Sequence, residues 1–271
     1  MRVRLLPSAH PGASATQGAL PAQPLTSYLV EGAGGAGPLV VDAGSVGLVG
    51  EPEEMARARG LVLTHAHIDH VASLPMWVEA LVSLDRAPVR IHASSAAIDA
   101  LRRHLFSGDL FPDFESITEP DGRPLIELVP FPVEEDFDLA GFRVRAFPVH
   151  HPVPTHGLVV DDGEDAVVFG ADSGPTDRLW EVTGETPRVR AIVIEASFPA
   201  RMQAIADGSG HLTPATLATE LAKAPPGVEI LVAHMKPAYR AEVLAGVREL
   251  GEERVQVLEP GSEVVLARTG G

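Results

Sequence analysis

One short segment constrains this chain more than any other. It reads Leu61-Val62-Leu63-Thr64-His65-Ala66-His67-Ile68-Asp69-His70, so three histidines and one aspartate lie within six residues behind an apolar run. His65 and His67 are two residues apart, which places both side chains on the same side of an extended segment. Imidazoles and carboxylates are the donors that zinc and similar divalent metals bind. The segment therefore predicts a strand, a ligand loop and a helix that starts near Val71, with ligand pairs for two adjacent metals.

Composition limits what else could hold a metal. The chain has 271 residues, 45% of them hydrophobic, which is enough for one large metallo-hydrolase domain over residues 1–271. It has no cysteine, so any metal must be held by histidine and carboxylate. We find no apolar run of membrane-spanning length and no leader-like N-terminus, so the cytoplasm is the expected location.

Net charge narrows the class of substrate. The chain carries a formal charge of −16, and its only lysines are Lys223 and Lys236. Because phosphate contacts dominate nucleic-acid affinity, a chain without a basic cluster is a poor partner for a large RNA or DNA. A small phosphate ester remains compatible, since bound divalent cations are often the largest local charges in such a site.

Strands and helices alternate along the chain, with short turns rich in Gly, Pro and Asp. This pattern predicts two packed sheets with helices outside, an α/β arrangement. Beyond an N-terminal strand around Val3 and Leu5, we expect strands at 25–30, 38–41, 61–63, 89–92, 125–130, 142–149, 158–160, 166–170, 191–195, 229–233, 255–258 and 264–267. Helices are expected at 51–59, 71–84, 94–105, 214–224 and 240–250, and an aromatic loop at 107–114.

Polar side chains follow four of the later strands. The segment 147–149 leads into His150-His151, and 167–171 leads into Asp172. The strands at 191–195 and 229–233 end at Glu195 and at His234. Because loops at strand ends commonly carry functional groups, these residues are candidates for the same site as the opening motif.

Taken together, these residues resemble a known family. A His-x-His-x-Asp-His motif followed by a His, an Asp and a His at strand ends is similar to the signature of the metallo-β-lactamase superfamily. The resemblance implies an αββα sandwich of two mixed sheets with outer helices, with pseudo-duplicated halves and an insertion over about 94–125. It also implies two metal sites that share Asp172, the first with His65, His67 and His151, the second with Asp69, His70 and His234.

Two adjacent histidines compete for one ligand position. Phosphodiesterase members of the superfamily often have a His-x-x-Pro-x-x-Gly arrangement there, which His151, Pro154 and Gly157 match. The spacing favours His151, and His150 remains the alternative. Asp42, after the strand at 38–41, is expected to support a ligand or close a turn rather than bind metal.

Later motifs narrow the resemblance. The segments Glu195-Ala196-Ser197-Phe198, Gly210-His211-Leu212-Thr213-Pro214 and His234-Met235-Lys236-Pro237 are similar to motifs of the class II cyclic-nucleotide phosphodiesterases. The first two also resemble loops of the tRNA 3′-processing endonucleases. The resemblance implies hydrolysis of a 3′,5′-cyclic nucleotide (cAMP or cGMP) to the nucleoside 5′-monophosphate by a metal-bridging hydroxide. A tRNA 3′-processing type of endonuclease, or another metal-dependent ester hydrolase of the superfamily, is the alternative.

The resemblance also implies which residues act in catalysis and in substrate binding. Asp69 would orient the hydroxide, and His211, held by Glu195, would protonate the leaving oxygen. Expected substrate contacts are Lys236, Phe111 and Thr213; for Phe111 the alternative is that it anchors the insertion.

The implied cofactors are two divalent ions, Zn²⁺ before Mn²⁺ or Fe²⁺. The expected partner is a small-molecule cyclic nucleotide, with no large nucleic acid and no membrane. The sequence leaves the oligomeric state open, although members of the superfamily often form homodimers. The choice between adenine and guanine stays open.

Overall fold

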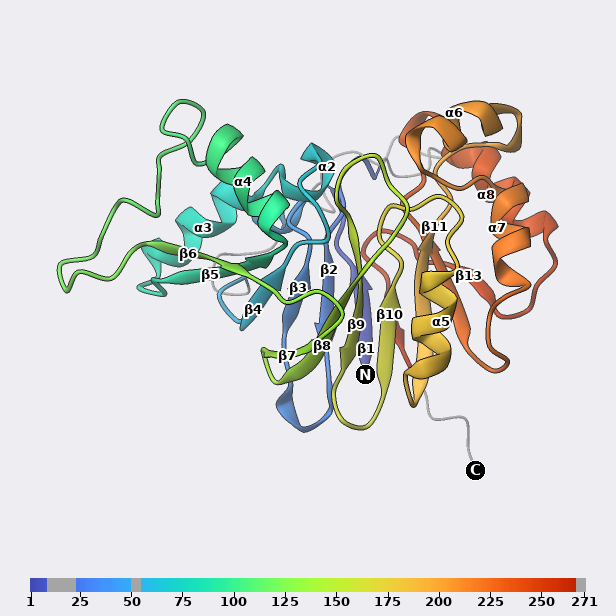
Figure 1. Cartoon of the computed structure of the whole chain (residues 1–271), viewed down its shortest axis with the longest axis horizontal. Helices are drawn as coiled ribbons and strands as arrows, with labels where there is room; N and C mark the ends of the chain where they lie inside the picture. Colours follow the sequence, from blue (N-terminus) through green and yellow to red (C-terminus); the bar gives the residue numbers. More distant parts are fainter. Residues whose placement is uncertain (9–22, 50–54, 267–271) are drawn as a thin grey trace.

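The computed structural model of this chain describes residues 1–8, 23–49 and 55–266. Two sheets lie face to face, and helices cover their outer faces (Figure 1). The expected αββα sandwich of two mixed sheets is thereby confirmed. Among the described residues, no helix combines the length and the apolar character that crossing a membrane requires.

In the described part of the chain, the first sheet has seven strands in the order β14-β1-β2-β3-β4-β5-β6. They span Arg2–Leu5 (β1), Tyr28–Glu31 (β2), Leu39–Val41 (β3), Gly60–Val62 (β4), Val89–Ala93 (β5), Ile126–Pro130 (β6) and Glu263–Val265 (β14). Strands β3 to β6 are parallel, whereas β14, β1, β2 and β3 pair antiparallel. All residues of β3 and β4 are buried, as expected for parallel strands covered on both faces.

The second sheet, again counted over the described residues, has seven strands in the order β13-β12-β11-β10-β9-β8-β7. They span Asp136–Leu139 (β7), Phe142–Pro148 (β8), His156–Asp161 (β9), Ala166–Phe169 (β10), Val189–Glu195 (β11), Glu229–Ala233 (β12) and Val255–Val257 (β13). Strands β10 to β13 are parallel, and β7 to β10 pair antiparallel. Strands β8, β10, β11 and β12 therefore run in one direction, and the segments that follow them meet at one edge.

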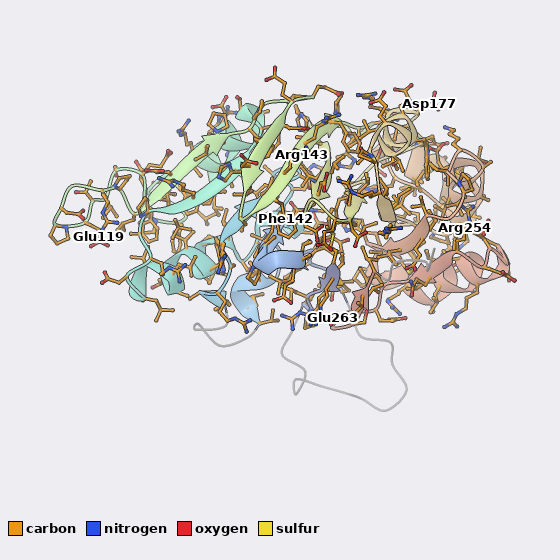
Figure 2. All side chains as sticks on the ribbon, turned by 90° about the horizontal axis from the view of Figure 1, so that it is seen from below. Glu119, Phe142, Arg143, Asp177, Arg254 and Glu263 are labelled. Atoms are coloured by element: carbon orange, nitrogen blue, oxygen red, sulfur yellow. The ribbon has the colours of Figure 1, made fainter. Side chains whose placement is uncertain are left out.

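A hydrophobic core fills the space between the sheets. Along β1, Val3 and Leu5 point into this core, while Arg2 and Arg4 point away from it, which is the two-residue period of a strand. Phe142, which is 1% exposed, lies near the middle of the molecule in this layer (Figure 2).

Helices form the two outer layers. The first sheet packs against α2 (Ile68–Val71), α3 (Leu74–Ser83) and α4 (Ser95–His104). The second packs against α5 (Arg178–Glu185), α7 (Pro214–Leu221) and α8 (Arg240–Glu249). Short elements complete the chain: α6 (Gln203–Ser209) and 3-10 turns at Ala33–Gly35, Val46–Leu48, Ala200–Met202 and Pro237–Tyr239.

Several elements differ from those expected. The helix predicted over 71–84 begins only at Leu74, as α3, and the short helix α2 precedes it. Pro75 in the first turn of α3 has no N–H to donate to the preceding turn, which separates the two helices. Strand β7 and helices α5 and α6 were not predicted. In β7 the charged residues Asp136 and Asp138 alternate with apolar ones, and aspartate is rare in strands; α5 contains Gly184, which disfavours a helix. Residues 51–54 of the helix predicted over 51–59 lie outside the described residues, and the helix does not continue to Arg59, since Ala56 and Arg57 form a turn.

Candidate metal centre

The loop after β4 carries the opening motif. His67 precedes the first turn of α2, and Asp69 and His70 lie within that turn. The loop is held against two segments of the first sheet: before β2, Thr26 N donates to Asp69 O (2.8 Å), and after β3, Ala43 N donates to His70 O (2.7 Å). A Cβ on Gly44 would lie 2.0 Å from Asp69 O, so only glycine allows this close approach of two backbones.

Seven side chains from four segments converge on two groups. One group contains His65, His67, His151 and Asp172; the other contains Asp69, His70, Asp172 and His234. Within each group the potential ligand atoms lie within 4.8 Å of one another. Asp172 belongs to both groups: its Oδ1 is 3.3 Å from His70 Nε2, and its Oδ2 is 3.1 Å from His234 Nε2 and 4.0 Å from His65 Nε2. The arrangement is compatible with divalent metal binding, with Asp172 between the groups.

The structure separates the two adjacent histidines. His151 Nε2 lies 3.2 Å from His67 Nδ1, inside the first group. His150 is exposed, and its backbone N–H donates to Ser173 Oγ at 3.2 Å. His151 is therefore the ligand candidate, as the spacing favoured.

Four of the candidate ligand histidines each form a hydrogen bond through the ring nitrogen that faces away from the group. The pairs are His65 Nδ1 with Thr64 Oγ1 (3.0 Å), His70 Nδ1 with Asp42 Oδ2 (2.8 Å), His151 Nδ1 with Gly210 O (3.0 Å), and His234 Nδ1 with Thr26 Oγ1 (2.9 Å). Such bonds orient metal-binding imidazoles and select their tautomers. We did not predict Thr64, Gly210 or Thr26; the only sequence signal was that Thr64 and Gly210 adjoin the motifs.

Two inward-facing nitrogens lack a hydrogen bond. Among the described residues, His65 Nε2 and His70 Nε2 are buried and have no hydrogen-bond partner. A buried polar atom without a partner is costly, and a bound cation would satisfy both of these. These two nitrogens, together with the histidine and carboxylate donors around them, therefore fit a divalent metal.

Burial tunes the first group towards neutral imidazoles. Burial is the largest cause that lowers the pKa of three histidines: His65 (well below its ordinary value), His67 and His151. A neutral imidazole has the free lone pair that a metal ligand needs.

Opposite charges dominate in the second group. Burial alone would raise the pKa of Asp172, but the imidazoles of His234 and His70 hold it well below its ordinary value. Burial would lower the pKa of His70, yet Asp172 and Asp42 together raise it well above its ordinary value. In this group the carboxylates thus stabilise the protonated imidazole of His70, and the imidazoles stabilise the ionised Asp172. A bound cation would supply the positive charge in place of that imidazolium proton.

Three non-glycine residues beside the groups have left-handed backbone conformations. They are Asp42 (φ 61°), Ala171 (φ 53°) and His234 (φ 54°). Each lies just after a strand, β3, β10 or β12 respectively, where the chain turns to present a side chain to the site. Such conformations cost free energy and concentrate at functional sites.

Glu195 and His211 form a buried pair beside the two groups. His211 Nδ1 is 2.6 Å from Glu195 Oε1, and Glu195 also accepts from Ser173 N (3.0 Å) and Leu212 N (3.3 Å). The His211 ring lies 5.1 Å from the ring of His151 and 5.9 Å from that of His234, centroid to centroid. Burial opposes the charged imidazolium, but attraction to Glu195 and their hydrogen bond outweigh it, so the pKa of His211 lies above its ordinary value.

The three expected substrate contacts have different surroundings. Lys236 Nζ lies 3.2 Å from Asp69 Oδ2 and 3.1 Å from His234 Nε2, at the second group. Phe111 packs against the core beneath the first sheet, with its ring 5.2 Å from that of Phe114. Thr213 is fully buried and caps α7, where its hydroxyl donates to Gln203 Oε1 (2.6 Å). Only Lys236 therefore lies at the metal ligands; contacts of Phe111 and Thr213 with substrate remain predictions.

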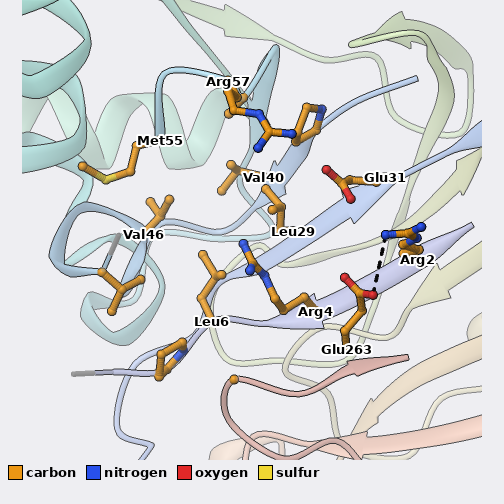
Figure 3. A pocket seen from close by; sticks show the side chains of 15 residues that line it. Arg2, Arg4, Leu6, Leu29, Glu31, Val40, Val46, Met55, Arg57 and Glu263 are labelled. Carbon is orange, nitrogen blue, oxygen red and sulfur yellow. Dashed lines mark ion pairs between the residues drawn. The ribbon is translucent and has the colours of Figure 1, made fainter. Parts of the chain in front are cut away.

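A separate cavity of about 550 Å³ opens on the outer face of the first sheet (Figure 3). Its apolar wall includes Leu29 and Val40, and Arg2 pairs with Glu263 at 3.8 Å on its rim. No histidine is among the described residues that line it, so the metal chemistry lies elsewhere.

Comparison with known sequences agrees with this geometry. The model of the beta-lactamase superfamily domain matches residues 43–235. A probable 3′,5′-cyclic-nucleotide phosphodiesterase from Yersinia pestis is 25% identical over 203 residues, which cover 66% of this chain and 57% of that protein. The chloroplastic tRNase Z TRZ2 of Arabidopsis thaliana is 28% identical over 110 residues, 40% of this chain and 29% of that protein. The matches thus span little more than half of one relative and under a third of the other.

Solved structures with this fold cover nearly the whole chain. Unliganded yeast PDE1 superposes with a TM-score of 0.75 at 16% identity, covering 97% of this chain and 98% of that one. The metallo-beta-lactamase fold protein YhfI from Bacillus subtilis superposes with a TM-score of 0.70 at 18% identity, with the same coverage. At these identities the likeness concerns the fold alone.

Proposed function

This chain belongs to the beta-lactamase superfamily, as a metal-dependent hydrolase, and from that premise we propose that it hydrolyses a 3′,5′-cyclic nucleotide to the nucleoside 5′-monophosphate. One observation carries the proposal: the buried pair of His211 and Glu195 stands beside two ligand groups that share Asp172. Hydrolysis of a phosphodiester expels an alkoxide, and this leaving group needs a proton. An ester whose leaving group is stable without protonation gives this pair no comparable task.

Two divalent ions would be held by the two groups, and we propose Zn²⁺ before Mn²⁺ or Fe²⁺. When bound, such ions lower the pKa of water and stabilise the charge that develops at phosphorus. The backing hydrogen bonds behind the ligand histidines would fix the ring orientations this requires.

Proton transfer is the part that the chain's own side chains perform. His211 Nδ1–H donates to Glu195, so the imidazolium would present its other N–H to the leaving 3′ oxygen. Because Glu195 raises the pKa of His211 above its ordinary value, the acid form persists to higher pH than in a free histidine. Asp69 would orient the attacking water, and Lys236, 3.2 Å from Asp69 Oδ2, would contact the phosphate.

The alternative substrate is an RNA 3′ end, because tRNase Z sequences match part of the chain. Charge argues against it: the chain has a formal net charge of −16, which repels a polyanion. A small cyclic nucleotide brings a single negative charge. We therefore propose a small-molecule substrate. One hydrolase domain over residues 1–271 and a cytoplasmic location are further proposals, and the oligomeric state stays open between a homodimer and other states.

The test is turnover of 3′,5′-cyclic AMP and cyclic GMP by zinc-loaded protein, with products separated by chromatography and metal content measured by mass spectrometry. A precursor tRNA and bis-p-nitrophenyl phosphate serve as parallel substrates. Formation of the 5′-monophosphate supports the proposal. Cleavage of precursor tRNA without turnover of either cyclic nucleotide would favour the endonuclease.

A further inference from the structure

We infer that Thr64 is a positioning residue that ties one ligand of each metal group to a single buried carboxylate, Asp42. The inference rests on the two-metal centre of the proposed function, but not on its substrate. It concerns which ring nitrogens of His65 and His70 face the metals.

Hydrogen bonds connect His65 to His70 through Thr64 and Asp42 without interruption. Thr64 Oγ1 lies 2.9 Å from Asp42 Oδ2 and 3.0 Å from His65 Nδ1. On the other side, Asp42 Oδ2 lies 2.8 Å from His70 Nδ1. All four side chains are at most 1% exposed, so water does not compete for these bonds.

The number of available protons fixes which group donates in each of these hydrogen bonds. A carboxylate only accepts, so His70 Nδ1–H and the Thr64 hydroxyl both donate to Asp42. The hydroxyl has one proton, so towards His65 it can only accept, and His65 must carry its proton on Nδ1. In the neutral imidazole that a metal ligand requires, Nε2 is then the unprotonated nitrogen of both histidines. Both Nε2 atoms are buried and have no hydrogen-bond partner among the described residues.

The backbone holds Asp42 and Thr64 together. Strands β3 and β4 are parallel neighbours with Val41 opposite Val62, so the residues just after them lie at the same edge. Asp42 N donates to Val62 O (2.9 Å), and Thr64 N donates to Asp42 Oδ1 (2.8 Å). The carboxylate is thus fixed by backbone as well as by side chains.

Two substitutions separate the two arms of the network. Thr64→Val keeps the shape but removes the acceptor for His65 Nδ1–H, so the first metal site should bind Zn²⁺ about 10- to 100-fold more weakly, with the second little changed. Asp42→Asn places an amide N–H₂ against His70 Nδ1 or the Thr64 hydroxyl, which disturbs both tautomers and should weaken both sites. Thr64→Ser retains the hydroxyl and should bind both ions normally.

The experiment uses full-length protein labelled with ¹⁵N-histidine. NMR of the metal-free protein reports which ring nitrogen of His65 and His70 is protonated, and calorimetry with Zn²⁺ alone reports the affinity of each site. The matched control is Thr183→Val, which removes a hydroxyl that is equally buried but donates to Leu179 O within α5 (2.7 Å).

Nδ1-protonated His65 and His70 in the wild type, with selective loss of one site in Thr64→Val, would support the inference. An Nε2-protonated His65 would overturn it, and this measurement needs no variant to fold. Unchanged Zn²⁺ binding by a folded Thr64→Val protein would overturn it too. If these results hold but cyclic nucleotides are not cleaved, the proposed substrate fails while the positioning role stands.

Discussion

His211 Nδ1 lies 2.6 Å from Oε1 of Glu195, and both side chains are buried beside the two metal-ligand groups. Glu195 ends strand β11, and two backbone N–H groups hold its carboxylate in place. His211 comes from the segment between α6 and α7, so the pair joins two separate segments at the edge where the ligands converge. This geometry makes the acid function of His211 open to experiment.

Replacing His211 should matter most for poor leaving groups. In His211→Asn, the amide can still donate to Glu195, but the proton for the leaving oxygen is lost. We expect kcat for cyclic AMP to fall about 100- to 10,000-fold. With bis-p-nitrophenyl phosphate the loss should be much smaller, because p-nitrophenolate leaves without protonation. Equal losses on both substrates, at unchanged metal content, would argue against an acid role.

The pH profile should depend on Glu195. The pKa of His211 is raised by Glu195, and the acid form is lost as pH rises through that pKa, so activity should fall on the alkaline side. In Glu195→Gln the attraction is removed, the pKa of His211 falls, and the alkaline limb of kcat should move to lower pH. Measuring kcat from about pH 5 to pH 10 tests this shift. Glu220 in α7 is an equally buried carboxylate that accepts a hydrogen bond from Trp180 Nε1, and Glu220→Gln should leave the alkaline limb of kcat in place.

The adjacent histidines offer a matched pair for metal binding. His151→Ala removes a member of the first group and should reduce bound Zn²⁺ from about two ions to about one per chain. His150→Ala changes an exposed side chain and should leave the metal content unaltered. Elemental analysis after dialysis gives the count directly. Loss of an ion from the His150 variant alone would exchange the two assignments.

Gly44 should tolerate no side chain. In Gly44→Ala the new Cβ would meet Asp69 O at 2.0 Å and Thr26 N at 2.6 Å, and both are backbone atoms. Overpacking of this kind costs about 1–3 kcal/mol or more, and here it would also displace the ligand loop. We expect a lower midpoint of thermal unfolding together with weaker Zn²⁺ binding.

Gly184 supplies the control for that change. It lies exposed in α5, and a Cβ there would meet no described atom within 4 Å. Because alanine is favoured over glycine in helices by up to about 1 kcal/mol, Gly184→Ala should be neutral or stabilising. Similar destabilisation by both changes would mean that Gly44 is not special.

The sequence alone was sufficient for the chemistry of the candidate site. Consecutive residues carry the ligand types, and local periodicity shows which strands they follow. The full set of seven ligand candidates and the pair of Glu195 and His211 were implied by the resemblance to the metallo-β-lactamase superfamily. The layered fold followed from the same alternation of strands and helices. Glycine- and charge-containing elements such as α5 and β7 were missed, because tertiary packing outweighs their weak local preferences.

Only the tertiary structure decided how those side chains are held. Thr26 supports His234 across 208 residues of sequence, and Thr64 joins His65 to Asp42 across neighbouring strands. Hydrogen bonds of this kind depend on where distant segments meet, and a lone threonine carries no local signal of it. The ligand types were therefore determined by the sequence itself, whereas their orientation and tautomers were decided by which strands lie side by side within a sheet and by how the two sheets pack.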